Sequence, residues 1–127
     1  MTEIDVQDKV CPVVSAAKLL GSVWSLVVIS YLMDGAMGFN ELLNKIPSLN
    51  SKTLSRTLKS LQAKNLIRRE VLSLQPFSVS YSLTPAAMDL KPLIKELRRW
   101  GYRWAMTQMP SQQDRFRKAR KAQRSLT

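Results

Sequence analysis

The sequence predicts a mainly helical α+β domain, and three observations support this fold class. Four successive segments have the apolar content and spacing of helices: residues 13–20, 23–33, 39–46 and 51–64. Two segments with strand character follow, with a turn between them near Gln75 to Phe77. Beyond Thr84, apolar residues again recur at helical spacing as far as Trp104. Helices that surround a single hairpin make the fold class α+β, mainly α.

Length and composition limit what the chain can be. Its 127 residues have room for one domain with a modest core. We expect residues 1–10 to form an N-terminal arm, residues 11–109 the folded domain and residues 110–127 a basic C-terminal tail. The first residues are acidic and polar, unlike a signal peptide, and the longest apolar run, residues 23–33, is too short to span a bilayer. The sequence therefore predicts a cytoplasmic protein with no membrane partner.

Histidine is absent from the sequence, and Cys11 is its single cysteine. These two facts exclude a zinc site of His and Cys ligands within one chain, and any nucleophilic device that needs a histidine base. An intramolecular disulfide is likewise impossible, which fits a reducing compartment. We therefore expect no catalytic residues, no metal and no cofactor, and the chain is not predicted to be an enzyme.

The charge of the chain is strongly basic and unevenly distributed. Lys and Arg number 20 against 9 Asp and Glu, which gives a net charge of +11. Residues 1–34 carry a net charge of −2, whereas residues 51–70 carry +5 and residues 91–127 carry +9. Such clustering is the electrostatic pattern of a surface that binds a polyphosphate. An anionic membrane would attract the same charge, so charge alone does not identify the partner.

The first two predicted helices have clear ends. Pro12 suits the start of the helix over residues 13–20, and Gly21 suits its C-terminal cap. Ser22 suits the N-cap of the helix over residues 23–33. Because this second helix is apolar nearly all round, we expect it to lie inside the core.

The helix over residues 51–64 has two contrasting faces. At about 100° per residue, three leucines fall on one narrow face and should pack into a core: Leu54, Leu58 and Leu61. The opposite face carries cations and short polar groups without an acid: Lys52, Arg56 and Lys59, flanked by Thr53 and Ser60. Just upstream, residues 39–46 form another short helix, and residues 47–50 form a turn. Taken alone, the basic face is equally compatible with an ordinary solvated surface.

Two strands and a long helix complete the predicted domain. Residues 66–72 and 79–83 form a hairpin, and Thr84 caps the helix that follows it. Pro92 within that helix predicts a kink near residues 89–91. Helix, turn, basic helix and hairpin in this order are the winged helix-turn-helix arrangement, in which the second helix enters the DNA major groove and the hairpin is the wing. The order of the elements therefore favours a DNA-contacting role for the basic helix.

The first half of the sequence contains motifs in the order found in one regulator family. Cys11-Pro12-Val13 is a characteristic opening, and residues 21–26 resemble a Gly-x-Lys-Trp-[Thr/Ser]-Leu segment. Residues 38–42 are similar to Arg-Phe-Asn-Glu-Leu, with Gly38 in place of the arginine. Residues 46–59 closely resemble the recognition segment of the same family. The family is that of the HxlR-type winged helix-turn-helix transcription regulators.

The second half continues this resemblance as far as Trp104. Residues 79–85 match the second wing strand and the start of the following helix, and Trp100-Gly101 matches a Trp-Gly pair. The resemblance implies a cytoplasmic, nucleoid-associated homodimer with N- and C-terminal dimerisation helices, which binds double-stranded DNA sequence-specifically and regulates transcription. It identifies no small-molecule inducer. At the wing, Ser78 stands where an arginine is usual, and we hypothesise that the basic tail supplies the phosphate affinity that the wing lacks.

The basic helix supplies most of the residues that we expect to contact DNA. Arg and Lys side chains donate to guanine O6 and N7, and Ser and Thr contact bases or phosphates. The candidates on this helix are Ser51, Lys52, Thr53, Ser55, Arg56 and Lys59. Arg68 and Arg69 at the first wing strand are candidate phosphate contacts, although a solvated strand end would also explain them.

Cys11 and the closing helix each have two interpretations. The resemblance implies that Cys11 senses oxidants or electrophiles, as a cysteine at this position does in some members, and a helix start with Lys9 nearby would favour a reactive thiolate. The alternative is a small buried hydrophobic residue without a redox role. The resemblance also implies that the closing helix forms a dimer interface: Leu93, Leu97, Trp100 and Trp104. A ligand-binding box of aromatic residues is the less common explanation of that pattern.

Two other functions are compatible with the sequence. An architectural protein that binds DNA largely irrespective of sequence would also use the basic tail and the net charge of +11. The ratio of specific to random-DNA affinity distinguishes such a protein from a regulator. A winged-helix module that binds proteins would instead show no salt-dependent binding of DNA.

Overall fold

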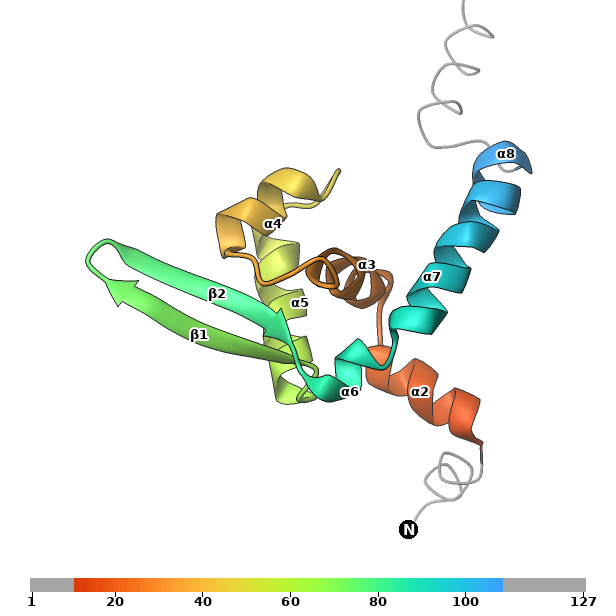
Figure 1. The fold of residues 1–127 in the computed structure, drawn as a ribbon, viewed down its shortest axis with the longest axis horizontal. Helices are drawn as coiled ribbons and strands as arrows, with labels where there is room; N and C mark the ends of the chain where they lie inside the picture. Colours follow the sequence, from red (N-terminus) through yellow and green to blue (C-terminus); the bar gives the residue numbers. More distant parts are fainter. Residues whose placement is uncertain (1–10, 109–127) are drawn as a thin grey trace, which may run out of the picture. The chain divides into compact units, whose positions relative to one another are not determined.

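The structure is a computed structural model that describes residues 11–108. The predicted N-terminal arm and basic tail lie outside the described residues. The chain divides into two compact units at Lys91/Pro92, which are described separately. The first unit contains four helices, a hairpin and a short helix (Figure 1): α2 (Pro12–Leu20), α3 (Val23–Leu32), α4 (Phe39–Lys45), α5 (Ser51–Ala63), β1 (Ile67–Leu74), β2 (Phe77–Leu83) and α6 (Pro85–Met88). Then follow α7 (Lys91–Trp100), the π-helical η1 (Gly101–Ala105) and α8 (Met106–Gln108).

The junction between α2 and α3 confirms both predicted caps. Gly21 has a φ of +78°, a conformation that glycine adopts readily, and its backbone N–H donates to the Ala17 carbonyl at 2.9 Å. The Ser22 hydroxyl accepts a hydrogen bond from the backbone N–H of Ser25 at 3.3 Å. These caps end one helix and begin the next without a connecting loop.

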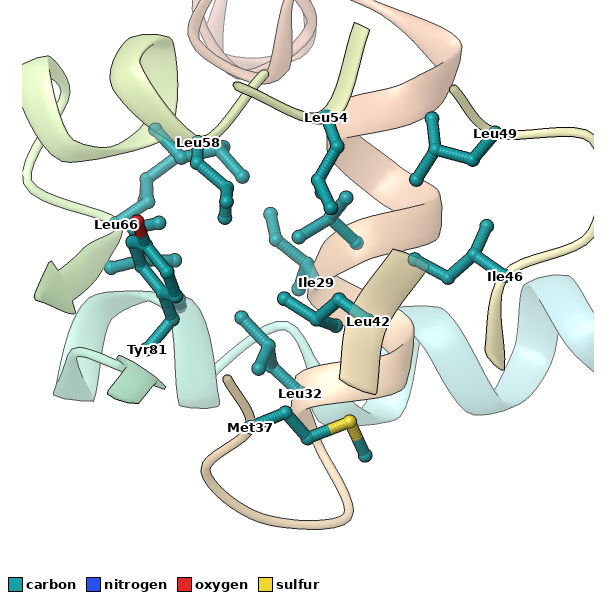
Figure 2. Packing of buried hydrophobic residues seen from close by; sticks show 14 residues of the cluster. Ile29, Leu32, Met37, Leu42, Ile46, Leu49, Leu54, Leu58, Leu66 and Tyr81 are labelled. Atoms are coloured by element: carbon teal, nitrogen blue, oxygen red, sulfur yellow. The ribbon is translucent and has the colours of Figure 1, made fainter. Parts of the chain in front are cut away.

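The core of the first unit lies around α3, as its apolar sequence predicts. Ile29 and Leu32 of this helix are fully or almost fully buried, and Leu42 of α4 and Leu58 of α5 pack into the same cluster (Figure 2). Tyr81 adds the one buried residue of β2 to the cluster. Burial of large apolar side chains is the main stabilising term in a domain of this size, so this cluster holds α4, α5 and the hairpin in place.

The hairpin is longer than the sequence pattern predicts. Leu74 pairs with Phe77 across the two-residue turn Gln75-Pro76, whereas the local sequence places the strand ends at residues 72 and 79. Cross-strand pairing extends both strands through residues with weak strand character, and a register shift between Val71 and Ser73 accommodates the extra residue Leu72.

The chain after β2 is broken where Pro92 predicts a kink. Thr84 caps α6, because its hydroxyl accepts from the backbone N–H of Ala87 at 3.4 Å and donates to the Asn65 carbonyl at 2.9 Å. Helix α6 ends at Met88 and α7 begins at Lys91. The π-helical turn at Gly101 was not predicted.

Across residues 11–108, no single helix has the length and hydrophobicity to cross a membrane. Helices α2 and α3 reach that length and hydrophobicity only when they are taken together, and they are bent by 81° relative to each other.

Candidate nucleic-acid interface

The orientation of α5 is fixed by its first turn and by its apolar face. The N-cap of α5 is Asn50, whose Oδ1 accepts a hydrogen bond from the backbone N–H of Thr53 at 2.8 Å. All three predicted leucines of this helix are buried, each at most 2% exposed: Leu54, Leu58 and Leu61. The helix therefore has a defined inner face and presents the opposite face to solvent.

The turn between α4 and α5 is anchored on both sides. Ile46 and Leu49 are buried in the core cluster, and between them Ser48 adopts a left-handed conformation with a φ of +64°. This conformation is uncommon for a residue with a side chain and allows the tight reversal of the chain. As a result, the two helices form a helix-turn-helix with a turn held by its own apolar residues.

The outer face of α5 carries the cationic stripe, which we define as Lys52, Arg56 and Lys59. All three side chains are exposed, and within residues 11–108 none of them takes part in an ion pair. Their spacing of four and three residues places them along one side of the helix over about 10 Å. Uncompensated positive charge in such a row attracts a polyanion.

The polar candidates of α5 surround this stripe. Ser51 is exposed, and Thr53 and Ser55 are partly buried at its margin. Thr57 belongs instead to the inner face, because it is buried and its hydroxyl donates to the Thr53 carbonyl at 2.8 Å. The structure thus brings all six predicted residues of the helix onto or beside one exposed surface.

Arg68 and Arg69 are both exposed but do not act as a pair. Consecutive residues of a strand point to opposite faces, and the two arginines pair with Ser82 and Tyr81 respectively. Arg69 shares the face of buried Tyr81, and its guanidinium carbon lies 5.9 Å from the centre of the Phe77 ring. Each arginine would therefore meet a different part of a ligand.

The end of the hairpin is apolar, a feature that the sequence reasoning missed. Three exposed side chains form what we call the wing tip: Leu72, Leu74 and Phe77. The signal was present in the sequence, since apolar residues flank the turn on both sides. The strand pattern of the sequence ends before the turn and so leaves these residues outside the expected strands.

Cys11 lies at the N-cap of α2. Its carbonyl accepts the backbone N–H of Ser15 at 3.1 Å, and the residue is only partly buried. Helix α2 has no buried residue, and Val13 and Leu19 are among its exposed apolar side chains. The lone thiol therefore lies at the positive end of a helix that is exposed in the single chain.

The four predicted interface residues of the second unit are exposed apolar side chains. Leu93, Leu97, Trp100 and Trp104 are spaced by four, three and four residues, so they fall on one side of α7 and η1. Their exposed fractions range from 40% to 55%. Arg103 lies beside this row, with its guanidinium carbon 5.4 Å from the Trp104 ring centre.

Residues 11–108 contain no group of His, Cys, Asp and Glu side chains that could hold a metal ion.

Comparison with known proteins agrees with this arrangement. The HxlR-like helix-turn-helix family matches residues 19–109. The transcriptional regulator YodB of Bacillus subtilis is 36% identical over 92 residues, which cover 72% of this chain and 82% of YodB. The reduced form of YodB superposes with a TM-score of 0.62 at 33% identity, over 80% of this chain and 97% of that one.

Two further solved structures share the fold. A MarR-family transcriptional regulator from Porphyromonas gingivalis has a TM-score of 0.69 and 32% identity, and covers 72% of this chain and 90% of its own. The redox regulator HypR in its oxidised form has a TM-score of 0.69 and 31% identity, over 74% and 97% of the two chains. The structure is a winged helix-turn-helix whose second helix, α5, presents an exposed cationic face. One family model matches most of the chain. The chain belongs to the HxlR-like helix-turn-helix family and is a DNA-binding transcriptional regulator.

Proposed function

We propose that the chain acts as a homodimer that recognises a pseudo-palindromic operator through α5. The observation that carries this proposal is the cationic stripe, which is exposed and has no ion pair with any residue of the described part of the chain, on a helix whose other face is fixed in the core. A two-fold dimer would present two such helices to successive major grooves, about 34 Å apart.

The residues of α5 divide into base and phosphate contacts by their chemistry. Lys52, Thr53 and Arg56 lie in the first two turns, where the recognition helix meets base edges, and Arg56 can donate twice to a guanine. Ser51, Ser55 and Lys59 are assigned to phosphates or neighbouring bases. Arg68 and Arg69 contact phosphates from opposite faces of the hairpin. We expect no catalytic activity.

The dimer forms through the exposed apolar sides of α2 and α7. An exposed row of Leu and Trp side chains is costly in water and is typical of a surface that pairs with another protein. We place the protein in the cytoplasm, on the nucleoid, because its ligand is chromosomal DNA. The regulator acts by occluding or recruiting RNA polymerase.

Selection of DNA from a random 30-bp pool tests this function. We expect the full chain to enrich one palindromic sequence and to bind it about 10³-fold or more tightly than random duplex. Arg56→Lys keeps the charge but loses the planar fork, so it should weaken specific binding while leaving random-DNA binding almost unchanged. Equal affinity for selected and random DNA would indicate an architectural protein instead.

We also propose that oxidants or electrophiles control DNA binding through Cys11. Support comes from its place at the N-cap of α2, beside the proposed dimer surface, and from the relatives. HypR is described as a redox regulator, and YodB has been solved after diamide treatment and with a bound quinone. With one thiol per chain, oxidation by diamide joins Cys11 of two chains, and each thiol gives up a proton and an electron to the diazene.

A further inference from the structure

Helix α7 carries positive charge on the side opposite its apolar row. Three of its cations form what we call the α7 stripe: Lys91, Lys95 and Arg98. At about 100° per residue, the three positions fall within about 60° of each other and opposite Leu93 and Leu97. All three side chains are exposed. The helix therefore has two different surfaces, of which the proposed function uses only the apolar one.

The charge of the α7 stripe is not neutralised within residues 11–108. Glu96 is the one acid in the sequence of residues 91–108. Its carboxylate accepts two hydrogen bonds from the guanidinium of Arg99, at 2.9 and 3.1 Å. In the described part of the chain, none of the three stripe cations takes part in an ion pair. A row of such cations attracts a polyanion.

The proposed homodimer leaves the α7 stripe in solvent. Pairing through Leu97 and its apolar neighbours covers the side of α7 that faces away from the cations. A dimer then carries two copies of the stripe. The recognition helices are separate elements of the same dimer, so an operator bound to α5 is not the ligand that the stripe by itself requires.

A DNA duplex has a charge spacing that matches the α7 stripe. Seven residues of helix separate Lys91 from Arg98, which is about 10 Å, and one strand of a duplex offers about three phosphates over that length. Contacts from Lys and Arg to phosphates carry no sequence information. An amphipathic helix on a membrane would instead bury its apolar side in the lipid, and that side is assigned to the dimer.

We propose that the α7 stripe binds a second DNA duplex, irrespective of its sequence, while the two α5 helices hold the operator. This inference rests on the proposed function, which supplies both the dimer and the operator. A regulator on the chromosome is surrounded by duplex DNA, and two stripes in one dimer bind more tightly than either alone. The protein thus joins two DNA segments.

A bridging assay tests the second site. The operator duplex is attached to beads, saturated with the full chain and washed, and a fluorescent duplex of random sequence is then added. Three phosphate contacts from each chain of a dimer give a slope of log K against log salt of about −5, so we expect retention at 50 mM salt and affinity about 10³-fold lower at 200 mM.

The triple variant Lys91→Gln/Lys95→Gln/Arg98→Gln removes the charge of the α7 stripe and keeps polar side chains. It should bind the operator with nearly wild-type affinity, because α5 is unchanged. Its affinity for the second duplex at 50 mM salt should fall by about tenfold or more, because the phosphate contacts are lost. Sedimentation velocity and circular dichroism check that the variant is still a folded dimer.

Adjacent arginines provide a matched control. Arg98→Gln and Arg99→Gln change the net charge equally, but only Arg98 belongs to the stripe, whereas Arg99 is engaged with Glu96. Arg98→Gln should make the salt slope for the second duplex shallower by about 1.8, one contact from each chain of the dimer. Arg99→Gln should leave that slope almost unchanged. This pair decides the question if the triple variant does not fold or dimerise.

Retention of the second duplex by the triple variant at the wild-type level would overturn the proposal, as would equal effects of the two single variants. Loss of bridging in wild type together with stripe-dependent binding to phosphatidylglycerol vesicles would assign the stripe to a membrane. A stripe-dependent footprint on DNA beside the operator, without bridging, would assign it to the operator's own flanks. Failure of the proposed function looks different, because wild type would then select no operator and the beads would hold no protein.

Discussion

The side-chain Oδ1 of Asn50 accepts a hydrogen bond from the backbone N–H of Thr53 at 2.8 Å, and this bond fixes the first turn of α5. Asn50→Ala leaves that N–H without its partner. We expect the free energy of unfolding to fall by about 1 kcal/mol, measured by urea denaturation. Asn50→Asp restores an acceptor and should recover most of the loss; equal losses in both variants would show that the cap is not the cause.

Leu58 of α5 should be far more important for stability than an exposed leucine of the hairpin. Leu58 is 2% exposed in the core cluster and Leu72 is 60% exposed. Leu58→Ala removes packed atoms and leaves a cavity, so we expect a loss of about 2–5 kcal/mol. Leu72→Ala should change stability by less than about 0.5 kcal/mol. Chemical denaturation of both variants measures the difference, and similar values would contradict the described core.

The basic tail should contribute to DNA affinity through counterion release. Between residues 111 and 127 the sequence contains six Lys and Arg residues and one acid. Replacing the six with Gln keeps the length of the chain and should flatten the dependence of log K on log salt, because fewer phosphates are neutralised. Fluorescence anisotropy at several salt concentrations provides the slope. A slope equal to that of wild type would refute the role of the tail.

Leu97 should be essential for the homodimer. It is 47% exposed in the single chain, between Leu93 and Trp100 on one side of α7. Leu97→Glu places a charge in the proposed interface, and its burial without a partner should shift the protein to monomer in sedimentation velocity. Glu96 is also exposed, but it is engaged with Arg99 and serves as a control site. Glu96→Gln should remain dimeric.

Oxidation should release DNA through Cys11 alone. Diamide treatment of wild type should weaken operator binding and produce a dimer band on a non-reducing gel, both reversed by dithiothreitol. Cys11→Ser removes the only thiol of the chain and should bind DNA equally with and without diamide. Sensitivity to diamide in this variant would exclude the thiol mechanism.

Local sequence signals were sufficient to predict several features of the fold. Gly21 and Ser22 are predictable as caps because a cap depends only on the residues of the adjacent helical turn. The spacing of the α5 leucines correctly predicts which face of that helix is buried. Pro92 indicated the break before α7. Such features depend on residues within one helical turn of each other, so the sequence displays them directly.

Features that depend on pairing between distant segments were not predicted. Met37 pairs with Tyr81, 44 residues later, as an isolated β-bridge. The strands extend to Leu74 and Phe77 because each supports the other, not because either has a strong strand pattern. The separation of Arg68 and Arg69 onto opposite faces follows from strand alternation and could have been stated from sequence once the strand was assigned.

The β-bridge beside the helix-turn-helix has a consequence for the kind of DNA that the protein prefers. The backbones of Met37 and Tyr81 exchange two hydrogen bonds, of 3.0 and 2.8 Å, and α4 begins two residues after Met37. Gly38 lies so close to β2 that a Cβ there would be 3.2 Å from the Val79 carbonyl oxygen. The base of the hairpin is thus held to the helix-turn-helix, and the protein sets the separation between α5 and the wing tip. In the binding mode that we propose, a duplex contacts both α5 and Arg68 and Arg69 of the hairpin and has to match that separation. We therefore expect sequences that narrow or bend easily to be favoured at base pairs that no side chain touches.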